Sequence, residues 1–180
     1  MIEPALSLFA DTIRQRSSEN RSALNVLRGK STSSVQASIL RLELDSLVRV
    51  IYLLNQNAQE RRRLCDLTNN GNMWRKESGN RITDRQMVDL ANNLNGWTEY
   101  VYKFGCAYIH LSNLHSFTSQ DLFDGLSDDE KGDIRLYIKN YHGSVIGETL
   151  ATSSFVHMIP SVFEKISNNL ECYLKELVSA

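Results

Sequence analysis

The segment Leu40–Leu54 limits the possible folds more than any other part of the sequence. Its apolar residues include Leu40, Leu44, Leu47, Val48, Val50, Ile51, Leu53 and Leu54. At about 100° per residue, they cover well over half of a helix circumference, which is typical of a helix surrounded by other elements. We therefore predict a buried helix at the centre of the protein. Its narrow remaining face carries a charge ladder at four-residue steps, formed by Arg41, Asp45 and Arg49.

The rest of the chain shows the same helical spacing. Apolar residues recur at three- and four-residue steps, with only two prolines and nine glycines in 180 residues, and no segment shows the alternation of a strand. We predict helices at Pro4–Arg28, Ser34–Thr68, Thr83–Phe117, Ser127–His142 and Ser153–Val178, with a loop at Asn69–Arg81 and a candidate break at Asn95-Gly96. Ser127 and Glu130 have the spacing of a capping box at the start of the fourth helix. The last helix carries one apolar stripe, formed by Ile159, Phe163, Ile166, Leu170, Tyr173 and Leu177. The expected fold is a single all-α domain, residues 1–180: a helical bundle of four to five helices around a long central helix.

Charge and cysteine content exclude several classes of protein. The 20 basic and 21 acidic residues give a net charge of -1, so a nucleic-acid-binding surface must be local. Cys65, Cys106 and Cys172 form no CxxC pair, which argues against a disulfide framework and a structural zinc. No apolar run has the length of a signal or membrane segment. We expect a cytoplasmic protein with reduced thiols, no metal and no cofactor.

Glu43 is the first candidate for chemistry, because it falls inside the apolar arc of the central helix. An unpaired carboxylate is costly to bury there, so Glu43 needs a partner. In the predicted helix Thr83–Phe117, His115 lies on an inward face with Phe104, Tyr108 and Leu111. A Glu43–His115 contact would raise the pKa of the imidazole and prepare it for acid–base catalysis. The alternative is a core polar network that only fixes helix register.

Arg135 and His142 are the second candidate pair. They are seven residues apart, which places them about 20° apart around a helix and roughly 10 Å apart along its axis. His142 precedes Gly143 at a predicted helix C-terminus, where free carbonyls favour the imidazolium form. The pair is suited to hold a phosphate and transfer a proton. The alternative is an ordinary solvated helix face.

One local basic neighbourhood surrounds the predicted loop. It includes Arg81 and Arg85 and is opposed locally by Asp66, Glu77 and Asp84. The candidate nucleic-acid-binding residues in it are Arg61, Arg62, Arg63, Arg75 and Lys76. We predict that these side chains contact nucleic-acid phosphates, and Trp74 beside them either stacks on a base or packs back onto the domain. The P-loop, the dinucleotide fingerprint, HExxH and GxSxG are absent from the sequence, which argues against the common nucleotide-binding, zinc-protease and hydrolase classes.

Two segments carry a resemblance to a known family. RLELDSLVRVIYLL, from Arg41, and YIHLSNLHSF, from Tyr108, resemble the HEPN-like superfamily, particularly its abortive-infection branches. The resemblance implies a bundle of four or five helices, usually dimeric, that cleaves RNA in toxin and phage-defence systems. The superfamily's signature is Arg, four to six residues, then His, and it cleaves by attack of the RNA 2′-hydroxyl without a metal. Arg135 and His142 meet this spacing, although the family's Arg is typically followed by a polar residue and here Leu136 follows.

The resemblance also implies roles and partners. His142 would act as the acid or base, Arg135 would stabilise the phosphorane, and Glu43 and His115 would support them or form a second site. The partners would be RNA, a second copy of the chain in a homodimer, and a cognate antitoxin or defence protein. Two alternatives stay open. One is a non-catalytic interaction or adaptor module, and the other is a small-molecule pocket lined by Tyr100, Tyr108, Tyr137 and Tyr141.

Overall fold

The computed structural model describes residues 3–30, 32–109, 127–142 and 152–179. In these ranges the chain forms seven α-helices and, apart from one isolated bridge between Arg75 and Arg81, no β-structure. The helices are α1 (Pro4–Leu27), α2 (Ser33–Leu54), α3 (Ala58–Asn69), α4 (Asp84–Asn95), α5 (Thr98–Ile109), α6 (Asp128–His142) and α7 (Thr152–Ser179). The prediction of an all-α helical bundle is confirmed.

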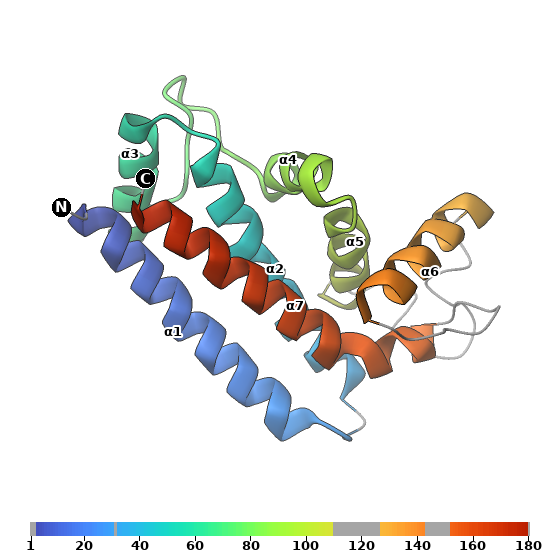
Figure 1. Ribbon diagram of the computed structural model, residues 1–180. Coiled ribbons are helices and arrows are strands. Elements are labelled where there is room, and N and C mark those ends of the chain that lie inside the picture. The colour runs from blue at the N-terminus through green and yellow to red at the C-terminus, as the bar shows by residue number, and fades with distance from the viewer. Residues whose placement is uncertain (1–2, 31, 110–126, 143–151, 180) are drawn as a thin grey trace.

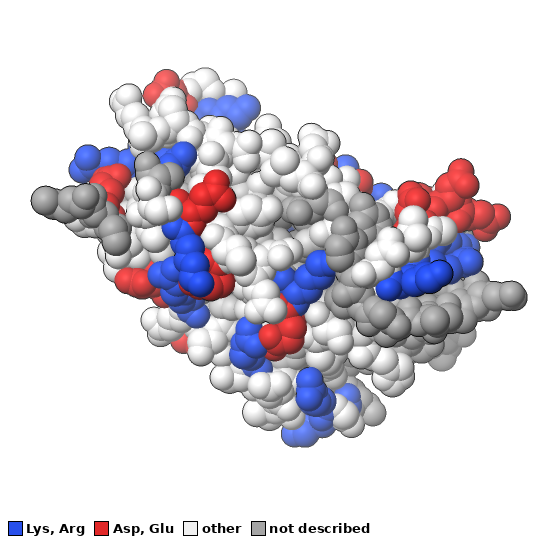
Figure 2. All heavy atoms as spheres, viewed as in Figure 1, with Lys and Arg blue, Asp and Glu red and all other residues white. Residues whose placement is uncertain are grey.

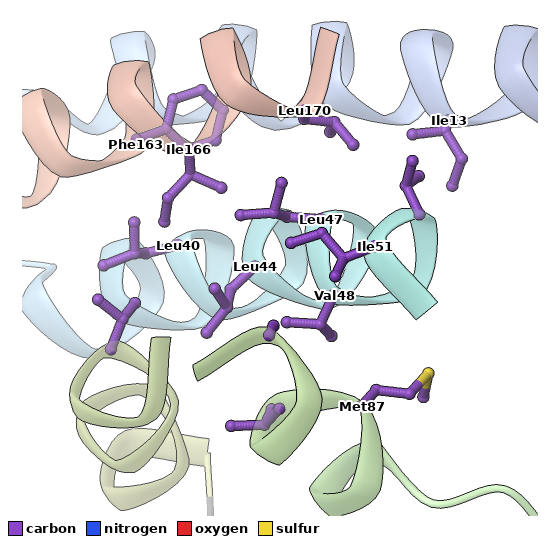
Figure 3. Close-up of a cluster of buried hydrophobic side chains, with 14 of the residues drawn as sticks. Ile13, Leu40, Leu44, Leu47, Val48, Ile51, Met87, Phe163, Ile166 and Leu170 are labelled. Atoms are coloured by element: carbon purple, nitrogen blue, oxygen red, sulfur yellow. The ribbon is translucent and has the colours of Figure 1, made fainter. Parts of the chain in front are cut away.

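Helix α2 occupies the centre of the bundle, as its apolar arc predicted. It packs against α7 on one side, against α4 and α5 on another, and against α1, which also lies along α7 (Figure 1). Leu40, Leu44 and Leu47 are completely buried. Figure 3 shows these side chains between α7, which contributes Phe163 and Ile166, and the α4–α5 side of the protein. Because α2 is enclosed by its neighbours, its polar side chains are held between the surrounding helices.

The predicted helix Ser34–Thr68 is wrong as a single element, because the chain turns at Asn55–Asn57. The Asn55 side chain donates to the carbonyl of Ile51 at 2.8 Å, and its backbone N–H bonds to the same carbonyl at 3.3 Å. Asn57 then caps α3 by accepting from the backbone N–H of Glu60 at 2.9 Å. Asparagine side chains compete for backbone groups in this way and end helices.

The predicted helix Thr83–Phe117 is also divided, at the candidate break. Gly96 adopts φ of 68°, a left-handed conformation that ends α4, and α5 begins at Thr98. Thr83 and Gln86 form a reciprocal capping box at the start of α4. The part of the prediction beyond Ile109 lies outside the described residues.

The last two helices follow their sequence signals. The Ser127 backbone N–H donates to the carboxylate of Glu130 at 2.9 Å, and the Glu130 N–H donates to the Ser127 hydroxyl at 3.3 Å, so the predicted capping box is present. On α7, most of the predicted apolar stripe is inaccessible or nearly so, namely Ile159, Phe163, Ile166, Leu170 and Leu177, whereas Tyr173 is only partly buried. In the described residues, no helix is long and apolar enough to cross a membrane.

Candidate functional site

The Glu43 carboxylate is completely buried and bonded to α1. One oxygen accepts from the Asn20 side chain at 3.0 Å, and the other accepts a short hydrogen bond from the Ser17 hydroxyl. Ser17 also lies 3.1 Å from the hydroxyl of Ser167 on α7, so the network joins α1, α2 and α7. His115, the partner expected from the sequence, lies outside the described residues. The described contacts of Glu43 hold α1 and α7 against α2, which is a structural role.

Sequence reasoning missed the α1 side of this network, although a signal was available. Ile13, Ser17, Asn20 and Leu24 follow one another at four- and three-residue steps along α1. Ile13 and Leu24 are buried core residues, so Ser17 and Asn20 between them had to face inward as well. Two inward polar side chains on one helix indicate a polar partner on the next.

Arg41 and Asp45 form the buried part of the charge ladder on α2. Arg41 is only 4% exposed, pairs with Asp45, and lies with its guanidinium carbon 4.1 Å from the ring centroid of Tyr102 on α5. A cation above an aromatic ring is stabilised by the charge distribution of the ring. Helix α5 therefore covers a face of α2 that looks polar in the sequence.

Arg49, the third member of the ladder, pairs with an acidic residue of another helix that the sequence did not link to the ladder. Asp84, the first residue of α4, lies 3.1 Å from one nitrogen of Arg49 and 3.9 Å from one of Arg41. The Arg49 guanidinium also lies 5.3 Å from the ring centroid of Trp74. Burial lowers the pKa of Arg49, and Asp84 opposes that shift. Three further arginines lower it as well: Arg16, Arg41 and Arg81.

Arg135 and His142 lie on one uninterrupted helix, α6, of which His142 is the last residue. Arg135 is half-buried, and its Nε is buried with no hydrogen-bond partner among the described residues. On the adjoining face, Ile134 and Ile138 are buried, so Arg135 lies at the edge of the surface that α6 presents to the protein. The His142 side chain is outside the described part of the structure.

The basic neighbourhood is largely engaged in holding the backbone. Arg61 donates to the carbonyls of Leu53 and Gln56, at 3.3 and 3.2 Å, at the end of α2. Arg75 donates to the carbonyl of Gly79 at 3.0 Å within the loop. These bonds are structural and leave fewer N–H groups for a ligand.

The other basic side chains differ in their surroundings. Arg63 is paired with Glu60 and donates to the carbonyl of Arg75. Arg62 forms an exposed ion pair with Glu3 at 2.7 Å, and Lys76 is exposed. The five cations therefore do not form one uniform surface.

Trp74 packs inside the protein, which decides between its two predicted roles. It is 4% exposed, its indole N–H donates to the Thr68 hydroxyl at 2.7 Å, and its ring lies near those of Phe9 and Tyr52. A ring so enclosed is unavailable to a base. The packing alternative is the one that the structure bears out.

Two further features bear on metal and ligand binding. In the described residues, no group of three His, Cys, Asp or Glu side chains is arranged to hold a metal ion. A pocket of about 640 Å³ lies between the α1–α2 turn and the start of α7. Its polar and charged lining residues are Arg28, Lys30, Ser33, Gln36, His157 and Ser161.

No match was found when the chain was compared with protein-family models, with curated proteins or with solved structures. The functional interpretation therefore depends on the residues of this chain.

Proposed function

We propose that this protein is a cytoplasmic, metal-independent endoribonuclease of the HEPN-like type, with Arg135 and His142 on α6 acting on RNA. The observation that supports this proposal is the register of α6, which runs unbroken from Asp128 to His142 and brings the two residues to one side, two turns apart. The buried Nε of Arg135 lacks a hydrogen-bond partner among the described residues, so no protein acceptor holds this side chain through that atom.

The charge distribution of α6 is compatible with an RNA ligand. Figure 2 shows the acidic side chains of this helix gathered at one end and its basic side chains along one side. The acidic residues are in its first turns, at Asp128, Asp129, Glu130 and Asp133, whereas Lys139 is exposed close to the proposed pair. A phosphate backbone would therefore approach the C-terminal half of α6.

The proposed chemistry is an intramolecular transesterification that cleaves the RNA backbone. A neutral imidazole takes the proton of a ribose 2′-hydroxyl, whose oxygen attacks the adjacent phosphorus. The bond from phosphorus to the 5′-oxygen breaks, and that oxygen takes a proton from an imidazolium. Arg135 donates hydrogen bonds to the oxygens of the phosphorane. The products are a 2′,3′-cyclic phosphate and a free 5′-hydroxyl.

One cleavage event requires a base and an acid at the same time. A homodimer that brings two copies of α6 together would supply one histidine for each role. We therefore include the homodimer in the proposal, with a cognate antitoxin or defence protein as the partner that would restrain such an activity.

The test is cleavage of a mixed cellular RNA pool by the purified protein in excess EDTA. We expect cyclic phosphate and 5′-hydroxyl ends, and a loss of about 100-fold or more in rate for His142→Ala and Arg135→Ala. His157→Ala is the matched control, because His157 is an exposed histidine on α7 that has no role in the proposed chemistry. A DNA copy of the substrate lacks the 2′-hydroxyl and is expected to stay intact.

The same experiment distinguishes the two candidate sites. If folded His142→Ala keeps full activity and His115→Ala loses it, the site belongs to His115 and the α6 proposal is wrong. If the wild type leaves RNA intact at all concentrations, or if all variants cleave equally, the protein is not this ribonuclease.

The alternative function is a non-catalytic interaction or adaptor module. The observation that favours it is the engagement of Glu43 by Ser17 and Asn20, because these contacts need no substrate to explain them. In this hypothesis the last helix or another exposed face binds a partner protein. It predicts that the wild type does not cleave RNA and that substitutions of the buried polar residues change stability alone.

A further inference from the structure

Four arginines from separate parts of the chain gather beside α2. We name them the α2 arginine cluster: Arg16 of α1, Arg41 and Arg49 of α2, and Arg81 of the loop before α4. Arg41 and Arg49 share Asp84, at 3.9 and 3.1 Å. Arg16 directly precedes Ser17, which is bonded to Glu43 of α2, and like-charge repulsion from Arg16 and Arg81 lowers the pKa of Arg49. The cluster is thus an electrostatic unit built from distant segments.

Not every arginine of the cluster forms an ion pair with a carboxylate. Asp45 is paired with Arg41, and Asp84 is shared between two arginines. The third carboxylate, that of Glu43, acts on Arg16 through space while it accepts hydrogen bonds from Ser17 and Asn20. Among the described residues, Arg41 and Arg49 are thus the members of the cluster that form direct ion pairs with a carboxylate.

Unlike Arg41 and Arg49, Arg16 has no ion pair in the described residues, and unlike the exposed Arg81 it is partly removed from water. It is half-buried on α1, where burial lowers its pKa, Glu43 raises it and Arg41 lowers it. Among the described residues it has neither a hydrogen bond nor an ion pair. A guanidinium removed from water and placed near other cations is unfavourable unless an anion approaches it.

The cluster can be reached from solvent along one strip of α2. Leu42 is 39% exposed there, and the side chains of Arg49 and Asp45 are 32% and 20% exposed. Arg41 lies beneath this strip, with 5% of its side chain exposed. The guanidinium groups of Arg41 and Arg49 lie over the rings of Tyr102 and Trp74. These side chains therefore lose little conformational freedom when a ligand binds.

We propose that the α2 arginine cluster binds a phosphate group, with Arg16 and Arg49 in contact with it and Arg41 as buried support. Phosphate suits the site because its several acceptor oxygens match the forked N–H donors of arginine. The phosphate can belong to a nucleic-acid backbone or to a small phosphorylated molecule. This site is separate from the α6 pair, and its occupancy does not depend on RNA cleavage.

The test measures binding of pyrophosphate, and of a short single-stranded DNA with and without a 5′-phosphate, to the full chain by calorimetry. DNA is used because the proposed ribonuclease cannot cleave it. We expect the wild type to bind, and Arg16→Gln and Arg49→Gln each to weaken binding about tenfold or more. Arg28→Gln is the matched control, because Arg28 is exposed at the end of α1 and lines the pocket at the α1–α2 turn.

A second readout separates a ligand site from a structural arginine. Because Arg16 has no ion pair in the described structure, Arg16→Gln is expected to keep or raise the thermal midpoint at low salt without ligand. It should also remove the stabilisation that pyrophosphate confers on the wild type. A lowered midpoint with unchanged binding would assign Arg16 a structural role and overturn the proposal.

The remaining outcomes also decide the matter. Equal binding with and without the 5′-phosphate identifies a backbone phosphodiester as the ligand, whereas binding of pyrophosphate and the 5′-phosphate alone identifies a terminal phosphate. No binding of any probe at millimolar concentration refutes the site. Loss of binding in Arg28→Gln but not in Arg16→Gln places the anion in the pocket at the α1–α2 turn and refutes it equally.

Discussion

Gly105 of α5 lies directly against the side-chain stem of Arg41 on α2. A Cβ atom at position 105 would be 2.7 Å from the Cβ of Arg41 and 2.9 Å from its Cδ. Such distances are shorter than real contacts between carbon atoms. The missing side chain therefore lets α5 approach α2 closely enough for Tyr102 to cover the guanidinium of Arg41.

The first prediction concerns this close approach. Gly105→Ala forces α5 away from α2 or distorts Arg41, so we expect a loss of about 1–3 kcal/mol in the free energy of unfolding. Urea unfolding followed by circular dichroism measures it.

Gly132 provides the control, because it lies within α6 and an added Cβ meets nothing within 4 Å. Gly132→Ala is expected to stabilise the protein by about 0.5–1 kcal/mol through helix propensity. Equal effects of the two alanines would show that helices α2 and α5 are not in close contact at Gly105.

The second prediction concerns the buried carboxylate of Glu43. Glu43→Ala leaves the Asn20 side chain without its acceptor, so we expect a loss of about 1–3 kcal/mol in unfolding free energy. Glu43→Gln keeps an acceptor for Asn20 and a group that can donate to Ser17, so it is expected to cost less. Denaturant unfolding of both variants measures the difference.

The same variant tests the role of Glu43 in catalysis. If the network only holds α1 on α2, folded Glu43→Gln cleaves RNA as the wild type does. Loss of cleavage in a folded Glu43→Gln protein would instead make the carboxylate part of the reaction.

Local signals were sufficient to predict the fold class and several elements. The apolar arc of α2 predicted burial because a helix that is apolar around most of its surface has to be surrounded. The capping box at Ser127 and Glu130 predicted the start of α6, since both partners lie within one turn. In each case the deciding interaction is short in sequence.

The missed features depend on residues that are distant in sequence. The turn at Asn55–Asn57 was missed because the apolar spacing continues into α3, where Leu64 is buried. The ladder on α2 was recognised, but its link to Asp84 is made by the packing of α4. The partners of Glu43 on α1 were missed for the same reason: helix periodicity gives the inward face of a helix but not its neighbour.

The third prediction concerns the pH dependence of the α6 cap. The backbone N–H of Ser127, and then its hydroxyl, donate to Glu130 and lower the pKa of that carboxyl. A carboxyl whose folded pKa is depressed stabilises the fold above its unfolded pKa and loses this effect as pH falls through the folded pKa.

We therefore expect Glu130→Gln to be less stable than the wild type at pH 7 and equal to it at acid pH. The difference in unfolding free energy should begin to shrink near the ordinary glutamate pKa of about 4.3. It should vanish once the pH lies below the lowered pKa of Glu130 in the folded protein. Urea unfolding of both proteins across this pH range measures it. A difference that persists unchanged at low pH would exclude the charge of Glu130 as its source.

The fourth prediction concerns the cysteines, which differ in exposure. Cys65 is completely buried, and burial raises the pKa of its thiol to about 12, whereas Cys172 is exposed on α7. The thiolate is the reactive form, and at pH 8 only about one Cys65 in ten thousand carries it. A thiol reagent is expected to modify Cys172 within minutes, and Cys65 only when the protein unfolds. The double variant Cys106→Ser/Cys172→Ser retains Cys65 alone, and rapid labelling of that folded variant would contradict the burial of this thiol.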